Sequence, residues 1–79
     1  MNAEKLNRLN KLLAEVFEVD KDSIYAETRF MEDLDSSSLK RMVIIAELKE
    51  LTGVALTAAK IKFMTTVNEL YEELGEWLR

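Results

Sequence analysis

The chain has 79 residues, of which 48% are hydrophobic and 33% are charged, and its formal net charge is −4. This balance predicts one small globular domain spanning residues 1–79 and excludes a disordered chain. The absence of cysteine and histidine removes disulfides, thiol nucleophiles and the commonest metal ligands. The negative charge disfavours a nucleic-acid partner, and no apolar run is long enough for membrane insertion. We therefore expect a cytoplasmic monomer without a metal site.

Two glycines and no prolines favour helices, because strand-turn architectures need more chain-reversing residues. The first helix is predicted from Ala3 to Phe17, because its apolar residues recur at helical spacing on one face. Residues 18–37 have no sustained period, so a long loop is predicted there, held down by single apolar anchors. The predicted anchors are Val19, Ile24, Tyr25, Phe30 and Leu34.

A second helix is predicted from Ser37 or Ser38 to Leu51 or Thr52, with Gly53 just past its end. Unlike a typical surface helix, it has two apolar stripes. One stripe consists of Ile44, Ile45, Leu48 and Leu51, and the other of Leu39, Met42, Val43 and Ala46. The second stripe indicates either a helix buried nearly all round or a partner surface beside the serines.

A short third helix is predicted at residues 57–61, capped by Thr57. The last helix is predicted to begin at Thr65 or Thr66, with Glu69 completing a capping box if Thr66 is the cap, and to extend to Trp77 and Leu78. These elements predict an all-α fold: a small four-helix bundle with a long loop between helices 1 and 2 and a short third helix. The predicted core is Leu9, Leu13, Phe17, Phe30, Ile44, Ile45, Leu48, Val67, Leu70 and Leu74.

Three consecutive serines, Ser36, Ser37 and Ser38, precede the second helix. Serine is a preferred N-cap, so a helix start alone explains the run. In a chain without histidine or cysteine, a hydroxyl at a helix start is also the leading candidate to accept a covalent modification. Glu32 and Asp33 are neighbouring carboxylates, but no partner base accompanies them. No catalytic residue is predicted, and we do not expect an enzyme.

The order of residues resembles the acyl carrier protein family, which includes peptidyl and aminoacyl carriers. The family pattern Phe-x-Glu-Asp-Leu-Gly-x-Asp-Ser-Leu is similar to Phe30-Met31-Glu32-Asp33-Leu34-Asp35-Ser36-Ser37-Ser38-Leu39, and the family's entry to the last helix matches Thr65-Thr66-Val67. The resemblance extends from about Leu6 to Leu74. It places Ser38 on the family serine that carries 4′-phosphopantetheine.

Several residues depart from the family pattern. Asp35 stands where the family has glycine, and Ser37 stands where it has aspartate. Lys40 and Arg41 follow Leu39, whereas fatty-acid carriers usually have a strongly acidic second helix. These departures favour a specialised acyl, aminoacyl or peptidyl carrier over the housekeeping protein.

The resemblance implies a covalent 4′-phosphopantetheine arm on Ser38 that carries acyl or aminoacyl intermediates as thioesters, in fatty acid biosynthesis or in other lipid or secondary metabolism. The implied partners are a phosphopantetheinyl transferase and the enzymes that load and receive the cargo. Because these partners must approach Ser38, we expect them to be recognised by Leu39, Lys40, Arg41, Met42 and Val43. The alternatives are an unmodified carrier-like interaction module and a small helical enzyme, which the missing histidine and cysteine disfavour.

Overall fold

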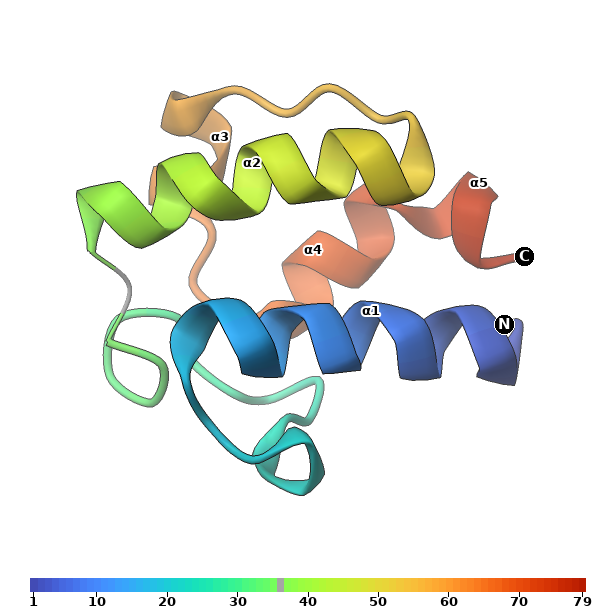
Figure 1. Cartoon of the computed structure of the whole chain (residues 1–79), viewed down its shortest axis with the longest axis horizontal. Coiled ribbons are helices and arrows are strands. Elements are labelled where there is room, and N and C mark those ends of the chain that lie inside the picture. The colour runs from blue at the N-terminus through green and yellow to red at the C-terminus, as the bar shows by residue number, and fades with distance from the viewer. Residues whose placement is uncertain (36) are drawn as a thin grey trace.

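The computed structural model describes residues 1–35 and 37–79 and shows a helical bundle (Figure 1). Its elements in chain order are α1 (Ala3–Phe17), the 3-10 helix η1 (Lys21–Ser23), α2 (Ser38–Thr52), α3 (Ala58–Phe63), α4 (Val67–Glu73) and α5 (Gly75–Leu78). Within the described ranges there is no strand, and a single antiparallel bridge pairs Arg29 with Thr66. The predicted all-α fold is confirmed.

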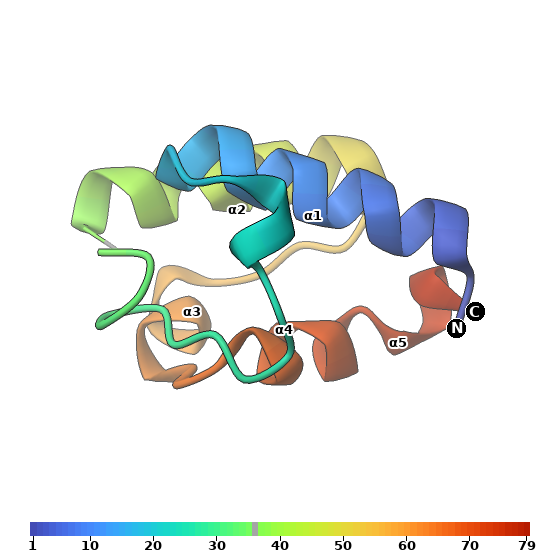
Figure 2. The same ribbon diagram turned by 90° about the horizontal axis from the view of Figure 1, so that it is seen from below.

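The helices form two layers (Figure 2). α1 and α2 lie side by side in one layer, and α3, α4 and α5 form the other. The predicted ends of α1 and α2 agree with the structure because both helices are capped locally. The Asn2 side chain accepts the Lys5 N–H at the start of α1, and Gly53 ends α2 with a φ of 78°, which favours glycine.

The predicted last helix is divided at Leu74 into α4 and α5, so the prediction of one continuous helix is wrong. α4 starts as expected, with a capping box made by Thr66 and Glu69. Gly75, a poor helix former, follows the break and opens α5. The change of direction lets Leu78 reach the core, where its carbonyl oxygen accepts the Asn2 N–H. The C-terminal helix α5 therefore packs against α1.

The core lies between the two layers and contains every predicted core residue except Ile45, which is only half-buried. Among the predicted loop anchors, Ile24, Phe30 and Leu34 are buried and Val19 is half-buried. Tyr25 is 62% exposed, so the prediction that Tyr25 anchors the loop is wrong. The loop gains its own short helix, η1, because the Asp20 side chain caps it by accepting the Asp22 N–H.

The two apolar stripes of α2 have opposite environments. Ile44 and Leu48 of the first stripe are fully buried, whereas Leu39 and Met42 of the second are exposed. The interpretation of α2 as a helix buried nearly all round is therefore wrong. The exposed stripe begins directly after the serines, at the end of the molecule away from both chain termini (Figure 1).

Candidate functional site

Ser38 is the first residue of α2, and its side chain is exposed. Its Oγ accepts a hydrogen bond from Arg41 Nη2 at 3.2 Å, which places a cation one helical turn from the hydroxyl. The first N–H groups of a helix also carry partial positive charge, because they have no partners within the helix. Both features favour a negatively charged group attached at this oxygen.

Ser37 and Ser38 differ in what their hydroxyls do. Ser37 is the N-cap of α2, and its Oγ accepts the Lys40 N–H at 3.2 Å. That hydroxyl is used to start the helix, whereas the Ser38 hydroxyl faces solvent. Ser37 occupies the position of the family aspartate, and since both residue types are good N-caps, the helix start is preserved. Ser36 lies outside the described residues.

The loop that leads to Ser37 is joined to the segment before α4. Phe30 and Leu34 are buried and anchor the loop in the core. The Phe30 N–H donates to the Thr65 carbonyl oxygen at 3.1 Å, and the Val67 N–H donates to the Thr28 carbonyl oxygen at 2.9 Å. The two motif segments that resemble the carrier family are therefore neighbours in space, although they are far apart along the chain.

The neighbouring carboxylates Glu32 and Asp33 stabilise the turn of this loop. Asp33 Oδ2 accepts the Arg29 N–H at 2.8 Å. Glu32 forms an ion pair with the Arg29 guanidinium, and this hydrogen bond raises the pKa of Arg29. Both carboxylates therefore have structural partners within the loop and do not form an acid–base pair with Ser38.

The backbone at Asp35 has a conformation that favours glycine, which is the residue that the carrier family has at this position. Its φ is 50°, in the left-handed region that glycine adopts freely and most other residues avoid. Aspartate is among the few residues that tolerate this conformation, because its short polar side chain can form local hydrogen bonds. The replacement of the family glycine by Asp35 is therefore compatible with the same loop path.

The predicted recognition residues occupy the first two turns of α2. Leu39 is 72% exposed and Met42 is 66% exposed, and Val43 lies on the same side of the helix. The two cations are half-buried, and Lys40 Nζ lies 4.0 Å from a carboxylate oxygen of Glu18. The structure thus brings exposed apolar side chains and two cations next to Ser38. The full set is Leu39, Lys40, Arg41, Met42 and Val43.

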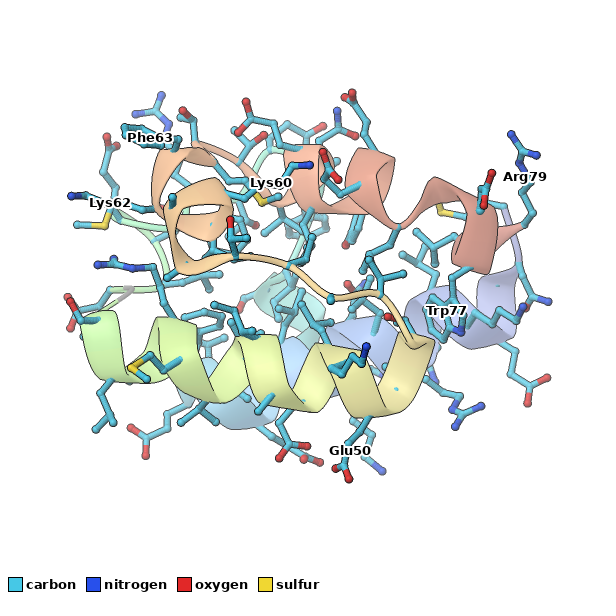
Figure 3. The ribbon with its side chains drawn as sticks, turned by 90° about the horizontal axis from the view of Figure 1, so that it is seen from above. Glu50, Lys60, Lys62, Phe63, Trp77 and Arg79 are labelled. Carbon is cyan, nitrogen blue, oxygen red and sulfur yellow. The ribbon has the colours of Figure 1, made fainter. Side chains whose placement is uncertain are left out.

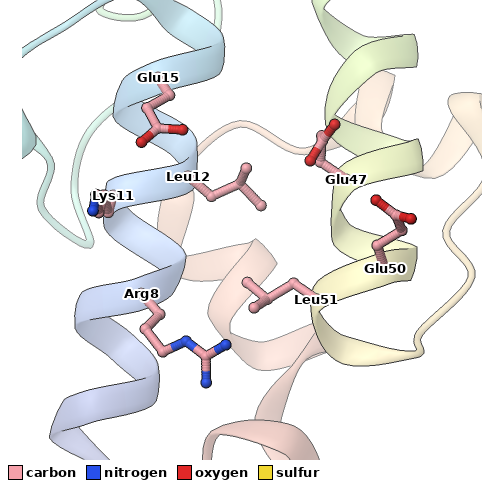
Figure 4. Close-up of a pocket in the computed structure, with 7 residues that line it drawn as sticks. All are labelled: Arg8, Lys11, Leu12, Glu15, Glu47, Glu50 and Leu51. Carbon is pink, nitrogen blue, oxygen red and sulfur yellow. The ribbon is translucent and has the colours of Figure 1, made fainter.

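A surface hollow lies between α1 and the C-terminal half of α2 (Figure 4). Its walls carry charge, and only two of the lining side chains are apolar. A long hydrocarbon chain is therefore a poor match for this hollow. It is also at the opposite end of α2 from Ser38. The lining residues are Arg8, Lys11, Leu12, Glu15, Glu47, Glu50 and Leu51.

Metal chemistry and membrane insertion were both disfavoured by the sequence. Across residues 1–35 and 37–79, no group of three or more acidic side chains is placed to hold a metal ion. No helix in the same ranges is long and apolar enough to cross a bilayer.

The fold and the site define a small helical domain in which the exposed Ser38 hydroxyl lies at the N-terminus of a long helix. Residues 7–74 match the family described as "Phosphopantetheine attachment site". The chain therefore belongs to the acyl carrier protein family, whose covalently bound prosthetic group is 4′-phosphopantetheine. The residues present fit this group, because the Ser38 hydroxyl is exposed and Arg41 and the first N–H groups of α2 lie beside it, where they favour a phosphate.

Curated relatives agree with this assignment. An acyl carrier protein of Lactobacillus acidophilus is 36% identical over 66 residues, which is 84% of this chain and 82% of the relative. Polyketide-8 synthase acyl carrier protein 2 of Streptomyces avermitilis is 34% identical over 67 residues, covering 85% of this chain and 77% of the relative. An acyl carrier protein of Rubrobacter xylanophilus is 30% identical over 73 residues, covering 92% and 90%.

Sequence reasoning did not select one exposed aromatic residue at the end of α3. Phe63 ends α3 and is 79% exposed, although a phenylalanine is usually buried. The predicted third helix ended at residue 61. Phe63 therefore lay outside it, and neither burial nor exposure was predicted for its side chain. A helix extended by two residues would have placed Phe63 away from the buried Ile61 and indicated its exposure.

Proposed function

We propose that residues 1–79 form one carrier domain that holds 4′-phosphopantetheine on Ser38 and presents acyl or aminoacyl thioesters to partner enzymes. The observation that carries the proposal is the contrast between two adjacent hydroxyls. Ser37 Oγ accepts the Lys40 N–H and caps α2, whereas Ser38 Oγ is exposed beside Arg41. Ser38 is therefore the hydroxyl that can be esterified without removing the helix cap.

The chain's own residues hold and orient the attached group. A phosphodiester on Ser38 Oγ carries a negative charge, which the Arg41 guanidinium can pair with by charge-assisted hydrogen bonds. The N-terminal N–H groups of α2 add to this favourable field. The prosthetic group supplies the thiol that a chain without cysteine lacks. The protein itself carries out no catalytic step and presents cargo to other enzymes.

The proposed partners are a phosphopantetheinyl transferase and the enzymes that load and receive the acyl or aminoacyl group. We propose a cytoplasmic monomer that docks them through Leu39, Lys40, Arg41, Met42 and Val43, the residues around the attachment site. The relatives include acyl carrier proteins and carriers of a polyketide synthase. The basic first turn of α2 supports a specialised carrier rather than the housekeeping one of fatty acid biosynthesis.

Intact mass spectrometry after co-expression with a broad-specificity phosphopantetheinyl transferase tests the attachment site. Wild type and the variants Ser36→Ala and Ser37→Ala are expected to gain the mass of one phosphopantetheine group. Ser38→Ala is expected to gain none, while its circular dichroism spectrum stays that of wild type. Modification of Ser38→Ala would refute the assignment of this serine.

The exposed apolar side chains of α2 also suit a second candidate, an unmodified module that docks on a partner. Leu39 and Met42 are available for contacts whether or not Ser38 is modified. This candidate predicts that no mass is gained with the broad-specificity transferase or in the native host. A gain of mass on wild type in the native host excludes it.

A further inference from the structure

The layer that α1 and α2 form has an outer side, and the hollow between these helices lies on it (Figure 4). The two helices run antiparallel, and the layer of α3, α4 and α5 covers only their inner side (Figures 1 and 2). Glu50 marks the outer side, because its side chain points away from that second layer (Figure 3). Among the described helices none packs on the outer side, so the hollow is open to a partner.

The floor of the hollow is apolar and its rim is charged (Figure 4). Leu12 of α1 and Leu51 of α2 point toward each other between the helices and are only half-buried. They therefore keep apolar surface that a partner can cover. An apolar contact within a charged rim is the usual arrangement of a protein interface. The charged residues of the rim, all exposed, are Arg8, Lys11, Glu15, Glu47 and Glu50.

The charges of the rim are ordered along the helices. Arg8 lies at one end of the hollow, and Glu15 and Glu47 lie across from each other at the other end (Figure 4). Arg8 and Glu15 are about 10 Å apart along α1, at about 1.5 Å per residue. In the part of the chain that the structure describes, none of these three side chains takes part in a hydrogen bond or an ion pair. Each can therefore pair with a partner without giving up an existing contact.

We propose that the hollow binds an amphipathic helix of another protein, which lies along α1 and α2. The groove between two antiparallel helices has the shape that a third helix fills, at interaxial distances of about 8–10 Å. The apolar side chains of the bound helix cover Leu12 and Leu51. A carboxylate on the same face pairs with Arg8, and a cation two turns away pairs with Glu15 and Glu47.

This interaction goes beyond the carrier function, because the hollow does not include Ser38. Glu47 and Glu50 lie about 14 and 18 Å from Ser38 along the axis of α2, at about 1.5 Å per residue. A helix bound in the hollow therefore leaves the Ser38 hydroxyl accessible. Such a helix holds the carrier to an assembly while the enzymes that act on the arm approach the other end of α2.

A nucleic acid or an anionic membrane is a poorer match for the hollow than a helix. Each presents a dense charge of one sign, so it attracts the Arg8 end of the hollow and is repelled by the end with Glu15 and Glu47. A helix carries both signs at the required spacing, because residues seven positions apart lie on the same face. Charge of both signs on the rim therefore favours a protein helix.

Three alanine-based helical peptides of about 20 residues test the proposal. Each has two adjacent leucines, with one charged residue three positions before them and another three positions after them. The charged pairs are glutamate with lysine, two glutamates and two lysines. ¹⁵N-labelled protein, with and without the arm, is titrated with each peptide at physiological salt, where charges are screened beyond about 8 Å.

The mixed peptide, with glutamate and lysine, is expected to bind about fivefold more tightly than either of the others, because only this peptide pairs with both ends of the hollow. It should shift the amide signals of Arg8, Leu12, Glu15, Glu47 and Leu51. Binding of none of the peptides would overturn the proposal, and so would equal binding of all three.

The double variant Glu15→Lys with Glu47→Lys makes both ends of the hollow basic. It should therefore bind the peptide with two glutamates about fivefold more tightly than the mixed peptide. The matched control, Glu72→Lys with Glu76→Lys, makes the same change of charge at exposed positions of α4 and α5 and should keep the wild-type preference. An unchanged preference in the first variant, or the same reversal in the control, would contradict the proposal.

Other occupants of the hollow give different results. If analytical ultracentrifugation shows a wild-type dimer that Glu15→Lys with Glu47→Lys abolishes, the occupant is a second copy of this chain and the proposal is wrong. Shifts confined to Leu39 and Met42 would place the peptide on the exposed stripe of α2 and also overturn it. Tighter binding of an RNA duplex or of phosphatidylserine vesicles at the hollow would do the same.

Intact mass separates this inference from the carrier function. With the mixed peptide at saturation, a purified broad-specificity transferase should add the phosphopantetheine mass at the rate of the free protein. Modification that the peptide blocks would refute the separation between the hollow and Ser38. If no mass is gained with or without the peptide, the carrier function is wrong, and the titration of the unmodified protein decides whether the hollow binds a helix.

Discussion

Replacing Glu18 by glycine is expected to raise the free energy of unfolding by about 0.5–1 kcal/mol. Glu18 follows α1 with a φ of 58°, a left-handed conformation that costs a non-glycine residue about 1–2 kcal/mol. Glycine removes this strain but loses about 0.5–1 kcal/mol because its unfolded chain is more flexible. The Glu18 side chain is 81% exposed and lies 4.0 Å from Lys40 Nζ, so the lost ion pair contributes little.

Thermal and urea unfolding followed by circular dichroism measure this change, which corresponds to a rise in Tm of about 2–8 °C. Glu15→Gly is the matched control, because it makes the same replacement inside α1 and should lower stability by about 1 kcal/mol. Glu18→Ala keeps the β-carbon and should show none of the gain. If Glu18→Gly is no more stable than Glu18→Ala, the left-handed conformation is not strained and the reasoning is refuted.

Three further predictions concern α2. Leu48→Ala should lower the free energy of unfolding by about 2–5 kcal/mol because Leu48 is fully buried, whereas Leu39→Ala on the exposed side should change it by less than about 0.5 kcal/mol; equal shifts in urea unfolding would contradict this core. Ser37→Ala should cost about 1 kcal/mol by removing the N-cap and Ser37→Asp should not, and equal melting temperatures would show that the cap is unimportant. Reversing Lys40 and Arg41 to glutamate should slow loading or transfer by the cognate enzyme at low salt and have less effect at high salt; equal rates at low salt, with the fold intact, would remove their role in recognition.

The elements that sequence reasoning predicted well are those that are determined locally. The periodicity of α1 and the glycine after α2 act within a few residues, so both helices were predicted to within one residue. The break at Leu74 was missed because Leu74 fits the apolar face of a continuous helix. The direction of α5 depends on the contact between Leu78 and Asn2, which lie at opposite ends of the chain.

The position of the candidate site could be predicted because the spacing of its residues along the chain matches a family pattern. The run from Phe30 to Leu39 located the helix start, but both Ser37 and Ser38 were possible first residues of the helix. Only the backbone geometry shows that Ser37 is the cap. Tyr25 and Ile24 were equally good anchors by composition, and packing against the core selects Ile24. Such choices depend on tertiary contacts that a single sequence does not contain.

The two chain ends lie next to each other, and this has a practical consequence for fusing the protein to other domains or fixing it to a support. The Asn2 N–H donates to the Leu78 carbonyl oxygen, and both termini lie at the end of the molecule opposite to the start of α2 (Figure 1). A linker, an affinity tag or a solid support joined at either terminus therefore leads away from Ser38. The domain can accordingly be fused at either end, or inserted between two others, while the serine faces freely outward.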